Sequence, residues 1–172
     1  MENENPVDTV DESLFPRELI EEKEEPKGAP AEQTISESLY GQIMKMSVSE
    51  KIKLAMVGNR EARNILIKES NRIVLNAVIN SPKLTEDDAL MYASNRSLSD
   101  EVIKLITLKK EFLQSYRMKL ALVTNPKTPP AVSLKLLNHV MEKDLRSIAK
   151  DKNVNPLISR QAIRVLSKQG KA

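Results

Sequence analysis

The sequence contains no cysteine and no tryptophan, and it has only two phenylalanines, three tyrosines and four glycines. Without cysteine the chain cannot form disulfides, thiolate zinc sites or cysteine-ligated iron–sulfur clusters, and it has no cysteine nucleophile. Strands favour aromatic and β-branched residues and need glycine in their turns, so this composition disfavours a β-fold. The abundant Leu, Lys, Ala, Glu and Met are helix formers, and we therefore expect an all-α fold.

Long apolar runs are also missing. No stretch approaches the roughly 20 apolar residues that a membrane-spanning helix needs. The first residues read MENENPVDTVDESLF and lack the basic and apolar regions of a signal peptide. We therefore expect a cytoplasmic protein that does not insert into a membrane.

Motifs that carry catalysis are absent as well. The sequence has no glycine-rich nucleotide-binding loop, no HExxH and no GxSxG. His139 is the only histidine, and one histidine cannot form a metal site by itself. The acidic groups at 86–88 and 100–101 fall in expected first helical turns, where carboxylates offset the helix dipole. We predict that the protein is not an enzyme and uses no cofactor or metal.

The charge is divided unevenly along the chain. Residues 1–38 hold twelve acidic and three basic groups, a net charge of −9, whereas the rest holds 24 basic and twelve acidic groups, a net charge of +12. Four prolines interrupt the first 33 residues, around one apolar island at 14–20. We expect a disordered acidic tail over residues 1–35, followed by a domain over 36–172. The island is either part of an inert solubilising tail or a short motif that orders on a partner.

Helix-capping patterns recur after the tail. Ser47 and Glu50 have the spacing of a capping box, and Thr85 with Asp88 is a looser version. A cap residue also precedes Pro129 and Pro156, each at an expected first helical position. We expect helices at 36–46, 48–57, 60–69, 71–80, 86–94, 99–109, 111–124, 129–141, 143–150 and 156–168.

A similar sequence motif, which we call the phrase, repeats along these helices. It consists of a helix with a central alanine, a turn that contains asparagine, a cap and a second helix. The small alanine allows close approach of helices, and the turn asparagine can bond its own backbone. Because one helix pair cannot bury its apolar stripe, successive pairs are expected to stack into one core. A compact bundle without repeats is the alternative. The phrase starts at Ile73, Arg117 and Leu145, with weaker copies at Ile52 and Tyr92.

Residues 120–166, which read LALVTNPKTPPAVSLKLLNHVMEKDLRSIAKDKNVNPLISRQAIRVL, resemble two consecutive units of the leucine-rich repeat variant family, a relative of HEAT-like repeats. The resemblance weakens back to Ser47 and is absent from the tail. It implies a right-handed α-solenoid of short helix pairs. One member of that family has a cysteine-ligated iron–sulfur cluster, from which this chain departs. The resemblance predicts a fold and leaves the function open.

Basic residues recur along the predicted stack. In the last helix they are spaced four residues apart, on a face separate from its apolar stripe. We predict a scaffold that binds an acidic protein segment on a basic surface, and the chain's own acidic tail is a candidate regulator. A nucleic-acid-binding protein, a self-associating structural element and an inert solvated face are the alternatives; the scarcity of aromatic residues weighs against nucleic acid. The candidate partner-binding residues are Arg60, Arg63, Lys104, Arg146, Lys150, Arg160, Arg164 and Lys168.

Overall fold

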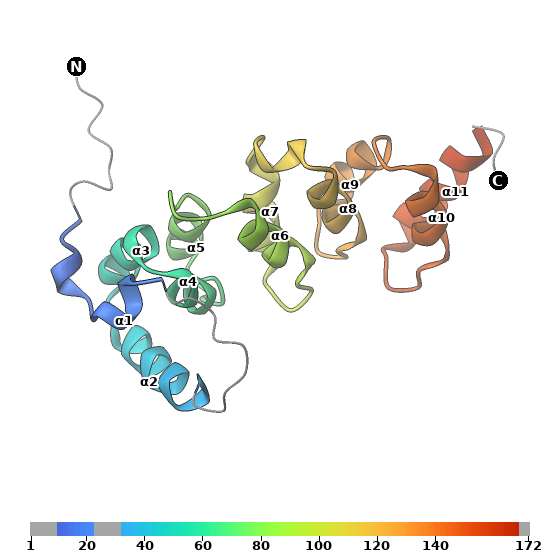
Figure 1. The fold of residues 1–172 in the computed structure, drawn as a ribbon. Helices are drawn as coiled ribbons and strands as arrows, with labels where there is room; N and C mark the ends of the chain where they lie inside the picture. Colours follow the sequence, from blue (N-terminus) through green and yellow to red (C-terminus); the bar gives the residue numbers. More distant parts are fainter. Residues whose placement is uncertain (1–9, 23–31, 169–172) are drawn as a thin grey trace, which may run out of the picture. The chain divides into compact units, whose positions relative to one another are not determined.

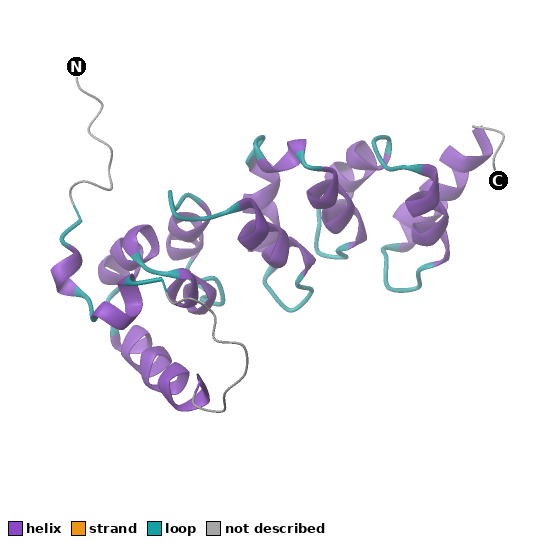
Figure 2. Cartoon of the chain, in the orientation of Figure 1, coloured by secondary structure: helices purple, strands orange, loops and turns teal. Residues whose placement is uncertain are grey.

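A computed structural model describes residues 10–22 and 32–168 of the chain, with side chains from residue 39 onward in the second range (Figure 1). Within these ranges every regular element is a helix, which confirms the all-α prediction (Figure 2). None of the described helices is both long and apolar enough to cross a membrane. The chain divides into two compact units, Met1–Leu84 and Thr85–Ala172.

The first unit is built around α4. This helix contacts α1, α2, α3 and α5, and α3 also contacts α5. Its core contains fully buried leucines such as Leu54 and Leu66. The elements are the 3-10 helix η1 (Glu12–Leu14), α1 (Arg17–Ile20), α2 (Glu32–Lys45), α3 (Val48–Val57), α4 (Arg60–Leu66) and α5 (Arg72–Ile79).

In the second unit, successive helices contact one another. Helix α6 packs on α7 and α8, α8 on α9, α9 on α11, and α10 on α11. Fully buried residues such as Ile103, Leu122 and Leu137 form its core. The elements are α6 (Glu86–Ser94), α7 (Asp100–Leu108), η2 (Phe112–Gln114), α8 (Tyr116–Thr124), α9 (Pro130–Leu137), α10 (Glu142–Lys150) and α11 (Pro156–Lys168).

Most of the predicted caps are confirmed. Ser47 and Glu50 form a reciprocal capping box, as do Thr85 and Asp88. The Asn155 side chain accepts a hydrogen bond from the N–H of Leu157 at the start of α11.

Four predicted helices needed correction. Helix α2 begins at Glu32 rather than 36, and α4 ends at Leu66 rather than 69. Helix α9 begins at Pro130 rather than 129, because a residue that precedes proline is disfavoured in the helical region and Pro129 is extended (ψ 128°). It ends at Leu137, before the predicted limit of 141. The helix predicted at 111–124 is divided, because Ser115 is extended (ψ 131°) between η2 and α8.

The predicted disorder of the acidic tail is not confirmed for residues 10–22. These residues contain η1 and α1, and they bury Phe15 (7% exposed) and Leu19 (0% exposed). The apolar island therefore contributes buried side chains to the first unit. Residues 32–35, also predicted as tail, belong to α2, so the tail ends earlier than predicted. The rest of the predicted tail at 1–9 and 23–31 lies outside the described residues.

Candidate peptide-docking site

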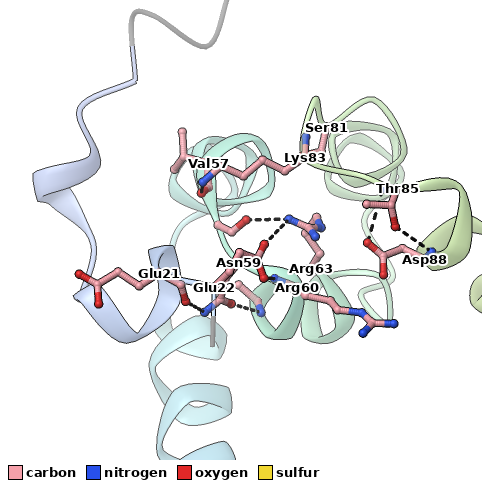
Figure 3. A network of polar contacts seen from close by, with 12 residues as sticks. Glu21, Glu22, Val57, Asn59, Arg60, Arg63, Ser81, Lys83, Thr85 and Asp88 are labelled. Atoms are coloured by element: carbon pink, nitrogen blue, oxygen red, sulfur yellow. Dashed lines mark hydrogen bonds and ion pairs between the residues drawn. The ribbon is translucent and has the colours of Figure 1, made fainter. Parts of the chain in front are cut away.

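The end of α1 is bound by a single asparagine in the turn between α3 and α4. The Asn59 N–H donates to the carbonyl oxygen of Leu19 at 2.7 Å. Its side-chain amide nitrogen donates to the carbonyl oxygens of Glu18 at 2.7 Å and Glu21 at 2.9 Å (Figure 3). Asn59 is 2% exposed, so these bonds form away from water. One buried asparagine, through its main chain and its side chain, thus binds three carbonyl groups of the N-terminal segment.

Local structure explains why the Asn59 amide faces α1. Asn59 is the N-cap of α4, and its Oδ1 accepts from the N–H of Ala62 at 2.9 Å. With the oxygen used as a cap, the amide nitrogen is left to donate elsewhere. Gly58 makes the turn possible, because a Cβ there would lie 2.5 Å from the carbonyl oxygen of Leu54 and 3.1 Å from the Ala62 Cβ.

Arg63 brings a positive charge to the same place. Its side chain is 2% exposed, and Nη1 donates to the Gly58 carbonyl at 2.9 Å. The same nitrogen lies 3.4 Å from Oε1 of Glu22, whose other oxygen accepts from the Arg60 N–H at 3.1 Å. The bond to Gly58 holds the guanidinium in position, so Glu22 meets a charge that is already oriented. We call Asn59, Arg60 and Arg63 the docking site.

Apolar burial anchors the bound segment. Leu19 is fully buried and α1 packs against α4, whereas Leu14 is 59% exposed. Complete burial of a leucine side chain contributes about 1.5–3 kcal/mol. Asp11 caps η1 through bonds to the Oγ and N–H of Ser13, and these bonds, together with the charge of Lys53 in α3, lower the pKa of its carboxyl group.

The predicted basic residues do not form one described surface. Arg60 and Arg63 belong to the docking site, although Arg63 is buried rather than exposed to solvent as a surface residue would be. The other predicted residues belong to the second unit, where Lys104 pairs with Asp100 at 3.0 Å within its own helix. Arg146 pairs in the same way with Glu142 at 2.9 Å. The remaining candidates are exposed on α10 and α11: Lys150, Arg160, Arg164 and Lys168.

Sequence reasoning missed the central role of Asn59, Leu19 and Glu22. The available signal was the apolar island at 14–20 inside an acidic segment, which predicted a motif that orders on a partner surface. In the structure the island is ordered on its own chain. Asn59 could not be singled out, because the sequence shows it only as one more turn asparagine.

Comparison of the chain with protein-family models, with curated proteins and with solved structures finds no match. The resemblance to leucine-rich repeat variants therefore stays a prediction. In the described ranges, no group of three or more histidine and acidic side chains is placed to hold a metal ion. The argument for function consequently depends on the docking site.

Proposed function

We propose that the chain is a non-enzymatic helical-repeat adaptor that binds an acidic segment of a partner protein at the docking site. Its own residues 14–22, which we call the intrachain segment, compete for that site. The observation that carries the proposal is the contact of Asn59 and Arg63 with Leu19 and Glu22. The successive packing of helix pairs in the second unit supports a solenoid scaffold for such a module.

The chemistry of the site is suited to a protein ligand. It binds main-chain carbonyl groups, which every peptide has, and adds selectivity through one buried apolar side chain and one carboxylate. A partner with these features can replace the intrachain segment. Direct support for an acidic ligand comes from Glu22, whose carboxylate lies 3.4 Å from Nη1 of Arg63.

Tethering makes the competition strong. A ligand joined to its site by a short linker has an effective concentration in the millimolar range. The apparent affinity for a partner equals the affinity of the open site multiplied by the fraction of molecules in which the site is open, so it decreases as that fraction decreases. A change that weakens the intrachain segment is therefore expected to strengthen partner binding without any change in the docking site.

The test compares the full-length chain with its Leu19→Ser variant, which releases the intrachain segment. Leu14→Ser is the matched control, because Leu14 is 59% exposed in the same segment. We expect Leu19→Ser to capture proteins from a cell extract that the wild type and the control capture weakly. A synthetic peptide of residues 10–22 should compete for this capture.

The same three proteins are titrated with mixed-sequence RNA and DNA at two salt concentrations. Tight binding that falls steeply with salt would replace the proposal with a nucleic-acid-binding function, because such a dependence reports counterion release. A shift of Leu19→Ser to a defined oligomer, without capture of other proteins, would favour the self-associating alternative.

A further inference from the structure

A second buried asparagine makes the same kind of contact as Asn59. Asn125 directly follows α8 and is 3% exposed. Its side-chain amide donates at 2.7 Å to the carbonyl oxygen of Ala93, in the last turn of α6. Its Oδ1 meanwhile accepts from the N–H of Lys127 at 3.0 Å and so shapes the turn. Both asparagines thus use the oxygen for their own turn and the amide for the end of an earlier helix.

The two sites differ in what they hold. Asn125 holds α6, which packs on α8 as one repeat packs on the next. Asn59 holds α1, a helix of four residues in the N-terminal segment. The intrachain segment therefore occupies the position that a helix of a preceding repeat occupies at Asn125.

From this equivalence we infer that the docking site accepts the C-terminal turn of a short helix from a partner protein, with a leucine-like side chain and an acidic residue three positions later. The inference rests on the proposed function and specifies its ligand. Leu19 and Glu22 have this spacing in the intrachain segment, which acts as an internal mimic of the partner.

Hydrogen-bond direction selects a helix end. The last turn of a helix has carbonyl groups without intrahelical partners, while its N–H groups are bonded within the helix. Here Leu19 and Glu21 donate their N–H groups to Pro16 and Arg17, at 2.9 Å each. In each contact described between the docking site and the segment, the donor is Asn59, Arg60 or Arg63 and the acceptor lies in the segment. An extended peptide would present N–H groups that need acceptors.

The acidic position is selected by Arg63. Its side chain is 2% exposed, and its Nη1 donates to the Gly58 carbonyl, which belongs to the turn next to the docking site and not to the ligand. A carboxylate three residues after the buried leucine meets this charge, whereas a lysine there would place two cations together. The site thus rejects a basic helix end and accepts an acidic one.

The test uses the full-length Leu19→Ser chain, in which the site is vacated, and a fluorescent synthetic peptide of residues 10–22. Fluorescence anisotropy reports binding. We expect Glu22→Lys in the peptide to weaken binding by about tenfold or more, since hydrogen bonds to charged groups are the stronger class. Leu19→Ser in the peptide should abolish binding, and Leu14→Ser should leave it unchanged.

A peptide with an ester in place of the Leu19–Ile20 amide separates carbonyl recognition from apolar burial. The carbonyl oxygen of the ester is a poorer acceptor for the Asn59 N–H than the amide carbonyl oxygen of Leu19 is, while the side chains stay the same. Weaker binding of this peptide supports recognition of the helix end. Equal binding of the ester, the Glu22→Lys and the unmodified peptides would overturn the inference, and protein capture by the vacated chain would still support the adaptor function.

A second full-length variant, in which the intrachain segment is weakened, guards against loss of folding in Leu19→Ser. Glu22→Lys in the full-length chain changes a side chain that is 54% exposed and leaves Leu19 in place. If Leu19→Ser keeps its helical circular dichroism but fails to bind the unmodified peptide, and Glu22→Lys binds it no more tightly than the wild-type chain does, the inference is wrong. If the wild-type chain forms a dimer that Leu19→Ser abolishes, a second copy supplies the helix end, and the assignment to a partner protein is overturned.

Discussion

Lys51 and Glu69 form an ion pair with 2.6 Å between Nζ and Oε1, and their side chains are only 11% and 15% exposed. Lys51 belongs to α3 and Glu69 to the turn that follows α4, so the pair joins the two segments that flank the docking site in the sequence. A charge that loses its partner in such a place costs more than a surface charge, because water cannot fully replace the contact.

We expect Glu69→Ala to lower the free energy of unfolding by about 1–3 kcal/mol, because it leaves the Lys51 ammonium group without its carboxylate. The Lys51→Met/Glu69→Ala double variant should recover part of this loss, since it removes the shielded charge. Lys104→Ala is the control: its partner Asp100 is 64% exposed, so no measurable change is expected. Urea unfolding followed by circular dichroism measures all three, and equal losses for Glu69→Ala and Lys104→Ala would contradict this account.

Gly58→Ala should destabilise the first unit by about 1–3 kcal/mol through overpacking. The backbone there has φ −63°, which any residue adopts, so the cost comes from the Cβ that would meet the Leu54 carbonyl at 2.5 Å. Gly41→Ala in α2 is the matched control. Its Cβ would have no neighbour within 4 Å, and a helical glycine replaced by alanine gains about 1 kcal/mol. Thermal or urea unfolding should therefore show a lower unfolding midpoint than wild type for Gly58→Ala and a higher one for Gly41→Ala.

We expect the second unit to lose stability at alkaline pH as the Tyr116 phenol is deprotonated. Burial and the hydrogen bond to Asp144 raise the pKa of Tyr116 above its usual 10.0. Its folded form holds the proton more tightly, so this contribution is complete below about pH 10 and is lost as the pH rises through the folded pKa. We expect Tyr116→Phe to cost about 1–2 kcal/mol at pH 8, where the Asp144 carboxylate and the Met141 N–H lose a partner.

The measurement is the difference in unfolding free energy between wild type and Tyr116→Phe at pH 8 and at pH 11. A difference that shrinks with rising pH supports the assignment. A constant difference would show that the phenol does not titrate with unfolding.

Local rules explain what the sequence could predict. The ranges of α3, α6 and α11 agree with the predicted ones, because each helix begins at a cap that the sequence displays, such as Ser47 with Glu50. Pro129 shows the limit of such rules, since the following proline moved the start of α9 by one residue. Ser115 interrupts a stretch that composition alone predicts as continuous helix.

The docking site could not be predicted, because it depends on contacts between residues far apart in the chain. Asn59 lies about 40 positions from the carbonyl groups it binds. Charge counting identified Arg63 as a surface residue, whereas the structure buries it beside Glu22. The net charges of opposite sign and the apolar island at 14–20 were the two signals that the acidic segment and the helical region are suited to each other.

Asn125→Ala should destabilise the second unit by about 1–3 kcal/mol, because it leaves the Ala93 carbonyl without its donor in a buried place. It also removes the turn bond to the Lys127 N–H. Asn153→Ala is the control, since Asn153 is an exposed residue in the turn between α10 and α11. Hydrogen exchange adds a local readout: amides in α6 and α8 should lose protection in Asn125→Ala while those in α3 do not. Equal protection in wild type and Asn125→Ala would mean that the Asn125–Ala93 bond does not hold α6 and α8 together, and the equivalence with Asn59 would lose its energetic basis.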